Sequence, residues 1–155
     1  MSFFGNLAAA RSAKALGEYN NQLYQQQAAY QREKAAVNLA TYNKIKRPLF
    51  VKNLKRSYSN FFVKALSTGA EFREGTSPYL AGLEFKINQA TDLTIADYNA
   101  EMDQQDQLNQ SLLLAARGQG ELFKGKLTAQ TERVKAVGSL LSTGYDMGYI
   151  GGGSA

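Results

Sequence analysis

The stretch EFREGTSPYLAGL, residues 71–83, interrupts a chain built mostly from helix-forming residues, and it contains one of only two prolines among 155 residues. Just before it, Gly69 follows an apolar helical turn and fits a helix C-cap, while Gly75 supplies a permissive backbone. Ser77 followed by Pro78 fits an N-cap and the first helical position after it. Together, Gly69, Gly75, Ser77 and Pro78 predict a corner between two helices.

The segments on both sides of this corner have helical patterns. Residues 48–68 repeat apolar and aromatic side chains at helical spacing, and residues 78–142 resume with Leu80, Leu83 and Ile87 on one face. Two helices joined by a short loop pack against each other in opposite directions. The sequence therefore predicts an all-α fold, an extended antiparallel helical hairpin without a β-sheet.

The first arm, residues 1–47, consists of helix-compatible residues with one apolar position in every seven: Leu16, Leu23, Tyr30 and Val37. The companion positions at 20, 27 and 34 are polar, so this face predicts a narrow, partly polar helix-packing seam. Pro48 lacks an amide donor and restricts Arg47 before it. We therefore expect the first arm to be kinked at the proline.

We expect one helical unit over residues 1–155. Its parts are an N-terminal helix, a basic-aromatic helix, the corner, a second arm and a flexible glycine-rich tail, at residues 1–47, 48–68, 69–77, 78–142 and 143–155. The tail prediction follows from the sequence TGYDMGYIGGGSA, in which four of the glycines lie within the last eight residues.

The composition disfavours catalysis. The chain has no His and no Cys, so the commonest general base, the commonest transition-metal ligand and all thiolate chemistry are missing. A GxxxxGK pattern spans residues 120–126, but Leu127 stands where a phosphate-binding loop needs Ser or Thr, and no strand precedes it. We predict no enzymatic activity, no cofactor and no metal site.

Charge is distributed unevenly along the chain. Residues 1–70 contain 11 Lys and Arg against 2 Asp and Glu, whereas residues 71–155 contain 7 against 11. No carboxylate lies between Glu33 and Glu71, and this gap holds seven cations: Lys44, Lys46, Arg47, Lys52, Lys55, Arg56 and Lys64. An apolar and aromatic face interleaves with them, formed by Phe50, Leu54, Tyr58, Phe61 and Phe62.

This basic-aromatic segment has more than one interpretation. Its cations could neutralise phosphates of DNA or of anionic lipid headgroups. They could instead face the acidic residues between 84 and 106 of the second arm, if the hairpin brings the two arms together. The aromatic face is more typical of a buried packing surface than of a ligand site.

Several short patterns resemble the small internal virion proteins, or ejection proteins, of short-tailed bacteriophages. They are an N-terminal helix rich in Ala, Gln and Tyr, the Gly-x5-Gly-x-Ser-Pro corner at 69–78, the stretch DYNAE at 97–101, and a small-residue end at 138–144. The resemblance covers about residues 7–144. It supplies no active site, and the segment after Pro48 departs from it.

The resemblance implies a structural virion protein that is made in the host cytoplasm, assembles near the portal and helps genome delivery across the host envelope. Its partners would be further copies of the chain, other virion proteins such as portal, tail or core proteins, and the host membrane or DNA. The alternatives are a helical head-to-tail adaptor or scaffolding protein of the virion, and a helical nucleic-acid-binding protein.

Overall fold

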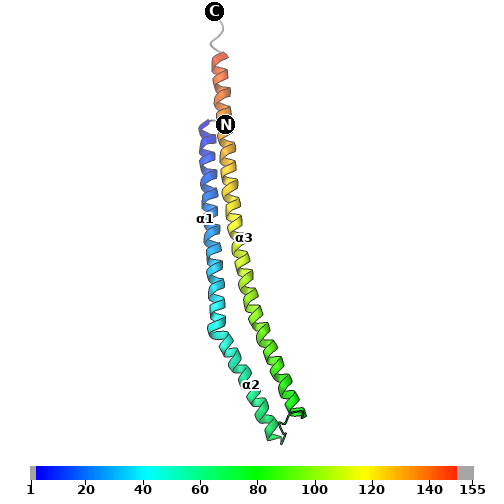
Figure 1. Cartoon of the computed structure of the whole chain (residues 1–155). Helices are drawn as coiled ribbons and strands as arrows, with labels where there is room; N and C mark the ends of the chain where they lie inside the picture. The colour runs from blue at the N-terminus through cyan, green and yellow to red at the C-terminus, as the bar shows by residue number, and fades with distance from the viewer. Residues whose placement is uncertain (1–2, 150–155) are drawn as a thin grey trace, which may run out of the picture. The chain divides into compact units, whose positions relative to one another are not determined.

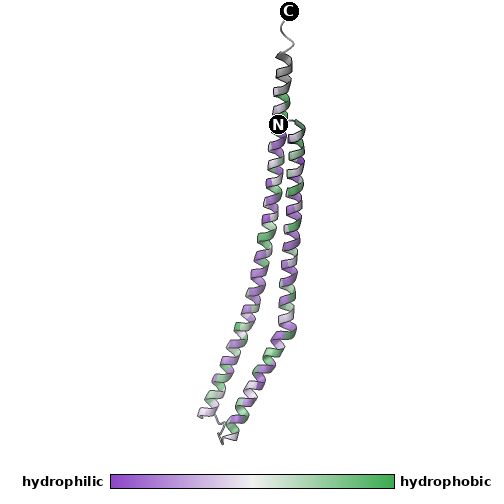
Figure 2. Ribbon diagram, turned by 180° about the vertical axis from the view of Figure 1, so that it is seen from behind, coloured by the Kyte–Doolittle hydropathy of each residue, from purple (hydrophilic) through white to green (hydrophobic). Residues whose placement is uncertain are grey.

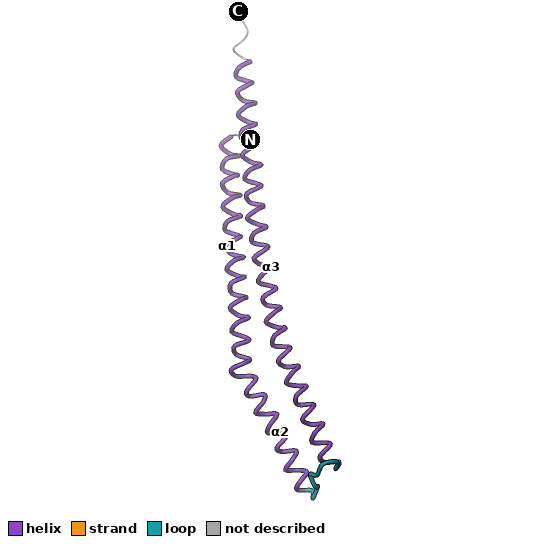
Figure 3. Tube along the Cα trace, viewed as in Figure 1, coloured by secondary structure: helices purple, strands orange, loops and turns teal. Residues whose placement is uncertain are grey.

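The computed structural model describes the backbone of residues 3–149 and the side chains of residues 3–142. All of its elements are helical, and no strand occurs over residues 3–149. The elements are α1 (Phe3–Thr41), a π-helical segment η1 (Tyr42–Lys46), α2 (Arg47–Ser67) and α3 (Ser77–Tyr149) (Figure 1). Within the described range, only residues 68–76 form a loop (Figure 3). The all-α prediction is confirmed, and the two long helices α1 and α3 pack together.

The contacts divide the chain into two compact units. Unit 1 comprises Met1–Gln31 and Gln110–Ala155, and unit 2 comprises Arg32–Asn109. Because α1 and α3 are long, each contributes one part to each unit. The single helical unit expected from the sequence stays a prediction.

In unit 1, α1 and α3 approach each other closely at glycines. A Cβ added to Gly125 would lie 2.8 Å from the Cα of Gly17, and one added to Gly118 would lie 2.9 Å from the Cβ of Tyr24. The buried side chains are also small, apart from that of Asn6: Ala10, Ala28, Ser111, Ala129 and Ala136. Residue numbers rise along α1 as they fall along α3, so the two segments run in opposite directions.

The apolar positions of the seam expected on the first arm are not buried, although its polar position Asn20 donates to the Glu121 carboxylate of α3 at 3.4 Å. Leu16 is 60% exposed and Tyr30 is 64% exposed, and Leu23 and Val37 are exposed as well. The helix instead turns toward α3 a different face, which contains Ala10, Gly17 and Ala28. Small residues occupy the contact face because they let the two backbones approach closely, and the larger residues face solvent.

Large apolar residues are therefore not gathered into one core. Figure 2 shows hydrophobic and hydrophilic residues alternating along the described lengths of α1, α2 and α3. Among the described residues, the fully buried hydrophobic side chains are all alanines. The fold consequently leaves much apolar surface exposed to solvent.

In unit 2, α2 ends and α3 begins within the stretch that the sequence marks as a corner. The amide of Gly69 donates to Leu66 O and that of Ala70 donates to Ala65 O, the two bonds of a Schellman motif. Gly69 and Gly75 both have positive φ, of 78° and 85°, a conformation that side chains other than glycine disfavour.

The start of α3 lies one residue earlier than predicted. Ser77 is the first residue of the helix, and the first turn is closed by the Leu80 amide donating to Thr76 O. The hydroxyl of Thr76 donates to Arg73 O, at 2.7 Å, which braces the loop. Pro78 is thus the second helical residue, where its missing amide hydrogen breaks no helical hydrogen bond.

A π-helical segment ends at Lys46, two residues before Pro48, and a kink caused by the proline is not confirmed. The chain is helical on both sides, and the Arg47 amide donates to Tyr42 O, five residues back. A wide turn with one extra residue gives the proline ring room where it would otherwise clash with a carbonyl of the preceding turn.

The predicted flexible tail, residues 143–155, is not confirmed either. Helix α3 extends to Tyr149, so the first part of that segment is helical in the structure. Residues 150–155 lie outside the described residues.

Candidate anion-binding surface

The seven cations of the basic segment lie on two consecutive elements of unit 2. Lys44 and Lys46 belong to η1, and the others belong to α2: Arg47, Lys52, Lys55, Arg56 and Lys64. All seven residues are exposed. Over the part of the chain that the structure describes, only Arg47 among them forms an ion pair.

The aromatic face of α2 packs against residues of the loop and of α3. The rings of Phe61 and Phe85 stack with centroids 5.3 Å apart, and Phe62 lies 4.6 Å from Phe72. Tyr58 also contacts Phe85, at 6.1 Å. The structure thus favours the packing interpretation of this face.

Four of the five predicted face residues are half-buried: Phe50, Leu54, Tyr58 and Phe61. Phe62 is 36% exposed. The backbone carbonyl of Leu54 accepts a hydrogen bond from the side-chain amide of Gln89 at 2.7 Å. This bond adds a polar contact to the aromatic ones. Insertion of these rings into a lipid interface would therefore require α2 to separate from α3.

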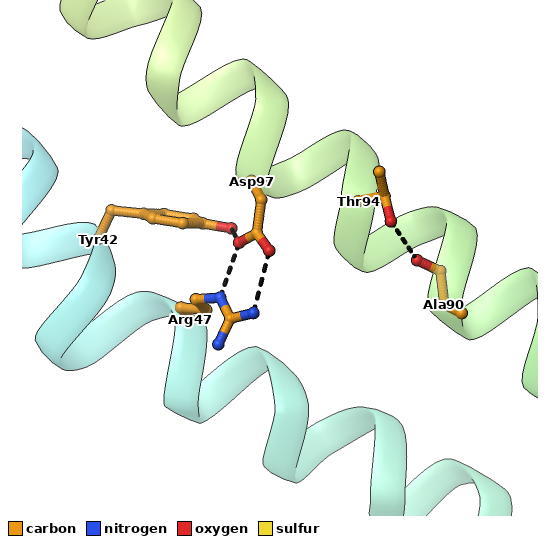
Figure 4. Close-up of polar contacts among 5 residues, drawn as sticks. All are labelled: Tyr42, Arg47, Ala90, Thr94 and Asp97. Carbon is orange, nitrogen blue, oxygen red and sulfur yellow. Dashed lines mark hydrogen bonds and ion pairs between the residues drawn. The ribbon is translucent and has the colours of Figure 1, made fainter.

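Arg47 has a different role from the other cations because it is held by Asp97. Its Nε donates to one carboxylate oxygen at 2.8 Å and its Nη2 donates to the other at 3.1 Å (Figure 4). The hydroxyl of Tyr42 donates to the same carboxylate at 2.8 Å. We call these three residues the Asp97 clamp.

The clamp shifts the titration of all three groups. Hydrogen bonds from Arg47 first, and from Tyr42 second, lower the pKa of the Asp97 carboxyl below its ordinary value. Burial, followed by the hydrogen bond to Asp97, raises the pKa of Tyr42. The same contact raises the pKa of Arg47. The carboxylate is thereby stabilised in its charged form.

Among the described residues, the acidic arm neutralises only part of the basic segment. Among the carboxylates between residues 84 and 106, Asp97 pairs with a cation of the segment, and the described residues show no second such pair. Six cations are left without an ion pair: Lys44, Lys46, Lys52, Lys55, Arg56 and Lys64. They form what we call the α2 basic surface.

Reasoning from the sequence missed the clamp and the glycine contacts. Asp97 is one of several acidic residues between 84 and 106, and nothing in a single sequence pairs it with a residue 50 positions away. Gly118 and Gly125 are not among the residues predicted to pack. Their separation of seven residues was the available signal, because it places both on one helix face.

The exposed cations of the α2 basic surface are suited to binding phosphate groups electrostatically. The described residues contain no cluster of three or more carboxylates that could hold a metal ion. In that same part of the chain, no helix is both long enough and apolar enough to cross a membrane. No protein-family model, curated protein sequence or solved structure matches the chain.

Proposed function

We propose that this chain is a structural virion protein, an internal or ejection protein that assembles near the portal and helps genome delivery across the host envelope. The observation that supports this role is that small and large residues occupy different positions in unit 1. Small residues make the helix contacts in unit 1, while large apolar side chains such as Leu16 and Phe123 stay exposed. A chain of this kind can pack on partners without losing an internal core.

The extended, Pro-kinked antiparallel hairpin predicted from the sequence belongs to this proposal. A helical chain without disulfides can pass a narrow portal and repack after release. Its role is structural, without catalysis, and its partners are other copies and neighbouring virion proteins.

Locating the protein in an intact particle tests the proposal. Cryo-electron microscopy of virions carrying a tagged chain should show the tag inside the head, next to the portal. Tag density around the outside of the tail would favour the head-to-tail adaptor instead, and absence from the particle would overturn both virion roles.

The α2 basic surface favours a direct contact with an anionic surface during delivery, either lipid or DNA. Replacing Lys52, Lys55 and Arg56 together with Gln should weaken binding to anionic vesicles by about 1 kcal/mol per charge at low salt, with little effect on neutral vesicles. As a control, Gln at Arg11, Lys14 and Lys34 removes the same charge from α1, where Lys14 is paired with Glu18 at 3.6 Å. That control should change vesicle binding much less.

DNA as the partner gives a different result with the same variants. The slope of the logarithm of DNA affinity against the logarithm of salt should then fall by about 0.7–0.9 for each phosphate contact that is lost. Unchanged binding to both vesicles and DNA, with helix content intact, would remove the α2 basic surface from the proposed function.

A further inference from the structure

In unit 1, α3 carries a heptad repeat that lies mostly on the side facing away from α1, although Leu113 and Gln130 border hollows that α1 side chains also line. Its members alternate in steps of three and four residues: Leu113, Ala116, Gly120, Phe123, Leu127, Gln130, Val134, Val137 and Leu141. All are exposed, with Phe123 at 68% and Val134 at 67%. The side of α3 that packs on α1 contains other positions, among them Gly118 and Gly125. We call this repeat the outer seam.

The outer seam has the form of a helix-packing surface. Apart from Gln130, the two repeating positions of each heptad hold apolar or small residues over four heptads. This spacing is typical of a coiled coil, whereas a lipid-facing helix has a wider apolar face. Gly120 supports this interpretation. A Cβ added there would meet no atom within 4 Å among the described residues, so contacts inside the chain do not require its small size. A glycine at this place lets another helix approach closely.

Cations flank the outer seam on both sides. Arg117 and Lys124 lie on one edge, and Lys126 and Arg133 lie on the other. The heptad positions beside the seam contain no carboxylate between residues 112 and 141. Such flanking positions set the choice of partner in coiled coils. The outer seam of a second copy would offer no opposite charge, so the matching surface must have acidic edges.

Unit 2 contains a surface with these properties. Ile95, Tyr98 and Met102 are exposed on α3, with Tyr98 at 59%, and follow the same steps of three and four. Glu101 flanks them on one edge and Asp106 on the other, and both are exposed. We call this surface the acidic seam. Its apolar residues match one heptad of the outer seam, since Thr91 and Gln105 at the next positions are polar, and its charges are opposite to those of the outer seam.

We propose that the outer seam of one copy docks on the acidic seam of a second copy. The apolar residues interlock, and Lys124 and Lys126 face Glu101 and Asp106 of the second copy. This contact deepens the proposed virion function, because it specifies the self-association on which that function rests.

Two charge-reversal variants of the full chain test the contact by sedimentation equilibrium in low salt. One carries Lys124→Glu and Lys126→Glu, and the other carries Glu101→Lys and Asp106→Lys. Each alone should weaken self-association by about tenfold or more, since attractive edges become repulsive ones. An equimolar mixture of the two should restore association, because each then supplies the charge that the other needs.

The matched control reverses two exposed cations on α1, with Arg11→Glu and Lys34→Glu, and should associate like the wild type. A wild-type chain that stays monomeric at all concentrations would overturn the proposal. So would variants that associate normally, or a mixture that fails to rescue association. If Leu127→Asp abolishes binding to anionic vesicles and leaves association unchanged, the outer seam faces lipid and the proposal is wrong.

This result is independent of where the protein lies in the virion. Loss of the contact with the tag still found beside the portal overturns the contact alone. Rescue by the mixture, combined with absence from the particle, overturns the proposed function and leaves the contact standing.

Discussion

In unit 1 and in unit 2, two helical segments run in opposite directions and pack together. The side chains that make these contacts differ between the two units. In unit 1 the segments meet at Gly17 and Gly125, where an added Cβ would be 2.8 Å from backbone. In unit 2 the rings of Phe61 and Phe85 fill the space between α2 and α3, and the Asp97 clamp adds an ion pair. Unit 1 should therefore be sensitive to added volume, and unit 2 to volume that is removed.

This difference has a consequence for the outward surfaces. Because small residues suffice for the internal contacts of unit 1, the large residues of α3 in that unit are free to form the outer seam. In unit 2 the aromatic residues of α2 are used internally, and its outward face is basic. The first surface suits a helix as partner, and the second suits an anion.

The largest effect is expected for Gly125→Leu. The new side chain has no space against Gly17 and the Ala13 carbonyl, so unit 1 should lose about 3 kcal/mol of stability. Amide hydrogen exchange measures this as a lower opening free energy for residues of unit 1, while unit 2 changes little. Equal losses in the two units would break the comparison.

The next effect is expected for Phe85→Ala in unit 2. Phe85 contacts both Tyr58 and Phe61, and its half-buried ring should account for about 2 kcal/mol, less than a fully buried Phe. Hydrogen exchange in dilute solution should show the loss in unit 2. The matched control Phe123→Ala removes an exposed ring from unit 1 and should change stability by less than about 0.5 kcal/mol.

A smaller effect of opposite sign is expected for Gly138→Ala. An added Cβ meets nothing within 4 Å at this helical position, so the change should stabilise α3 by about 0.5–1 kcal/mol through backbone entropy. Slower amide exchange near residue 138 would show it. Destabilisation at this position would mean that the glycine has a contact which the internal packing does not reveal.

The smallest effect concerns pH and the Asp97 clamp. The pKa of Asp97 is lowered in the folded chain. The stability that ionised Asp97 contributes is therefore fully present above the ordinary Asp pKa of about 3.9, and it is lost as the pH falls through the lowered pKa of the folded chain. Carboxyl NMR titration should find Asp97 below that ordinary value. Arg47→Gln should raise it toward the ordinary value. An ordinary pKa for Asp97 in the wild type would show that Arg47 and Tyr42 do not hold this carboxylate in solution.

The sequence by itself determined that the chain is helical and where its one described loop lies. Helix-forming residues fill both arms, and the glycines at 69 and 75 can hold positive φ at low cost, so local preferences alone place the break between Ser67 and Ser77. The basic surface of α2 was also visible, because a long gap without carboxylates is a property of sequence. These features depend on neighbours along the chain.

Only the tertiary structure decided which face of each helix packs. Leu16 and Gly17 are adjacent, and hydrophobicity favours Leu16 as the contact, yet Gly17 meets Gly125 because backbone approach depends on the partner helix. Asp97 likewise finds Arg47 and Tyr42 only once α3 lies beside them. Helical periodicity shows which residues share a face of a helix. Which of these faces packs depends on the shape and charge of a partner helix from a distant part of the chain.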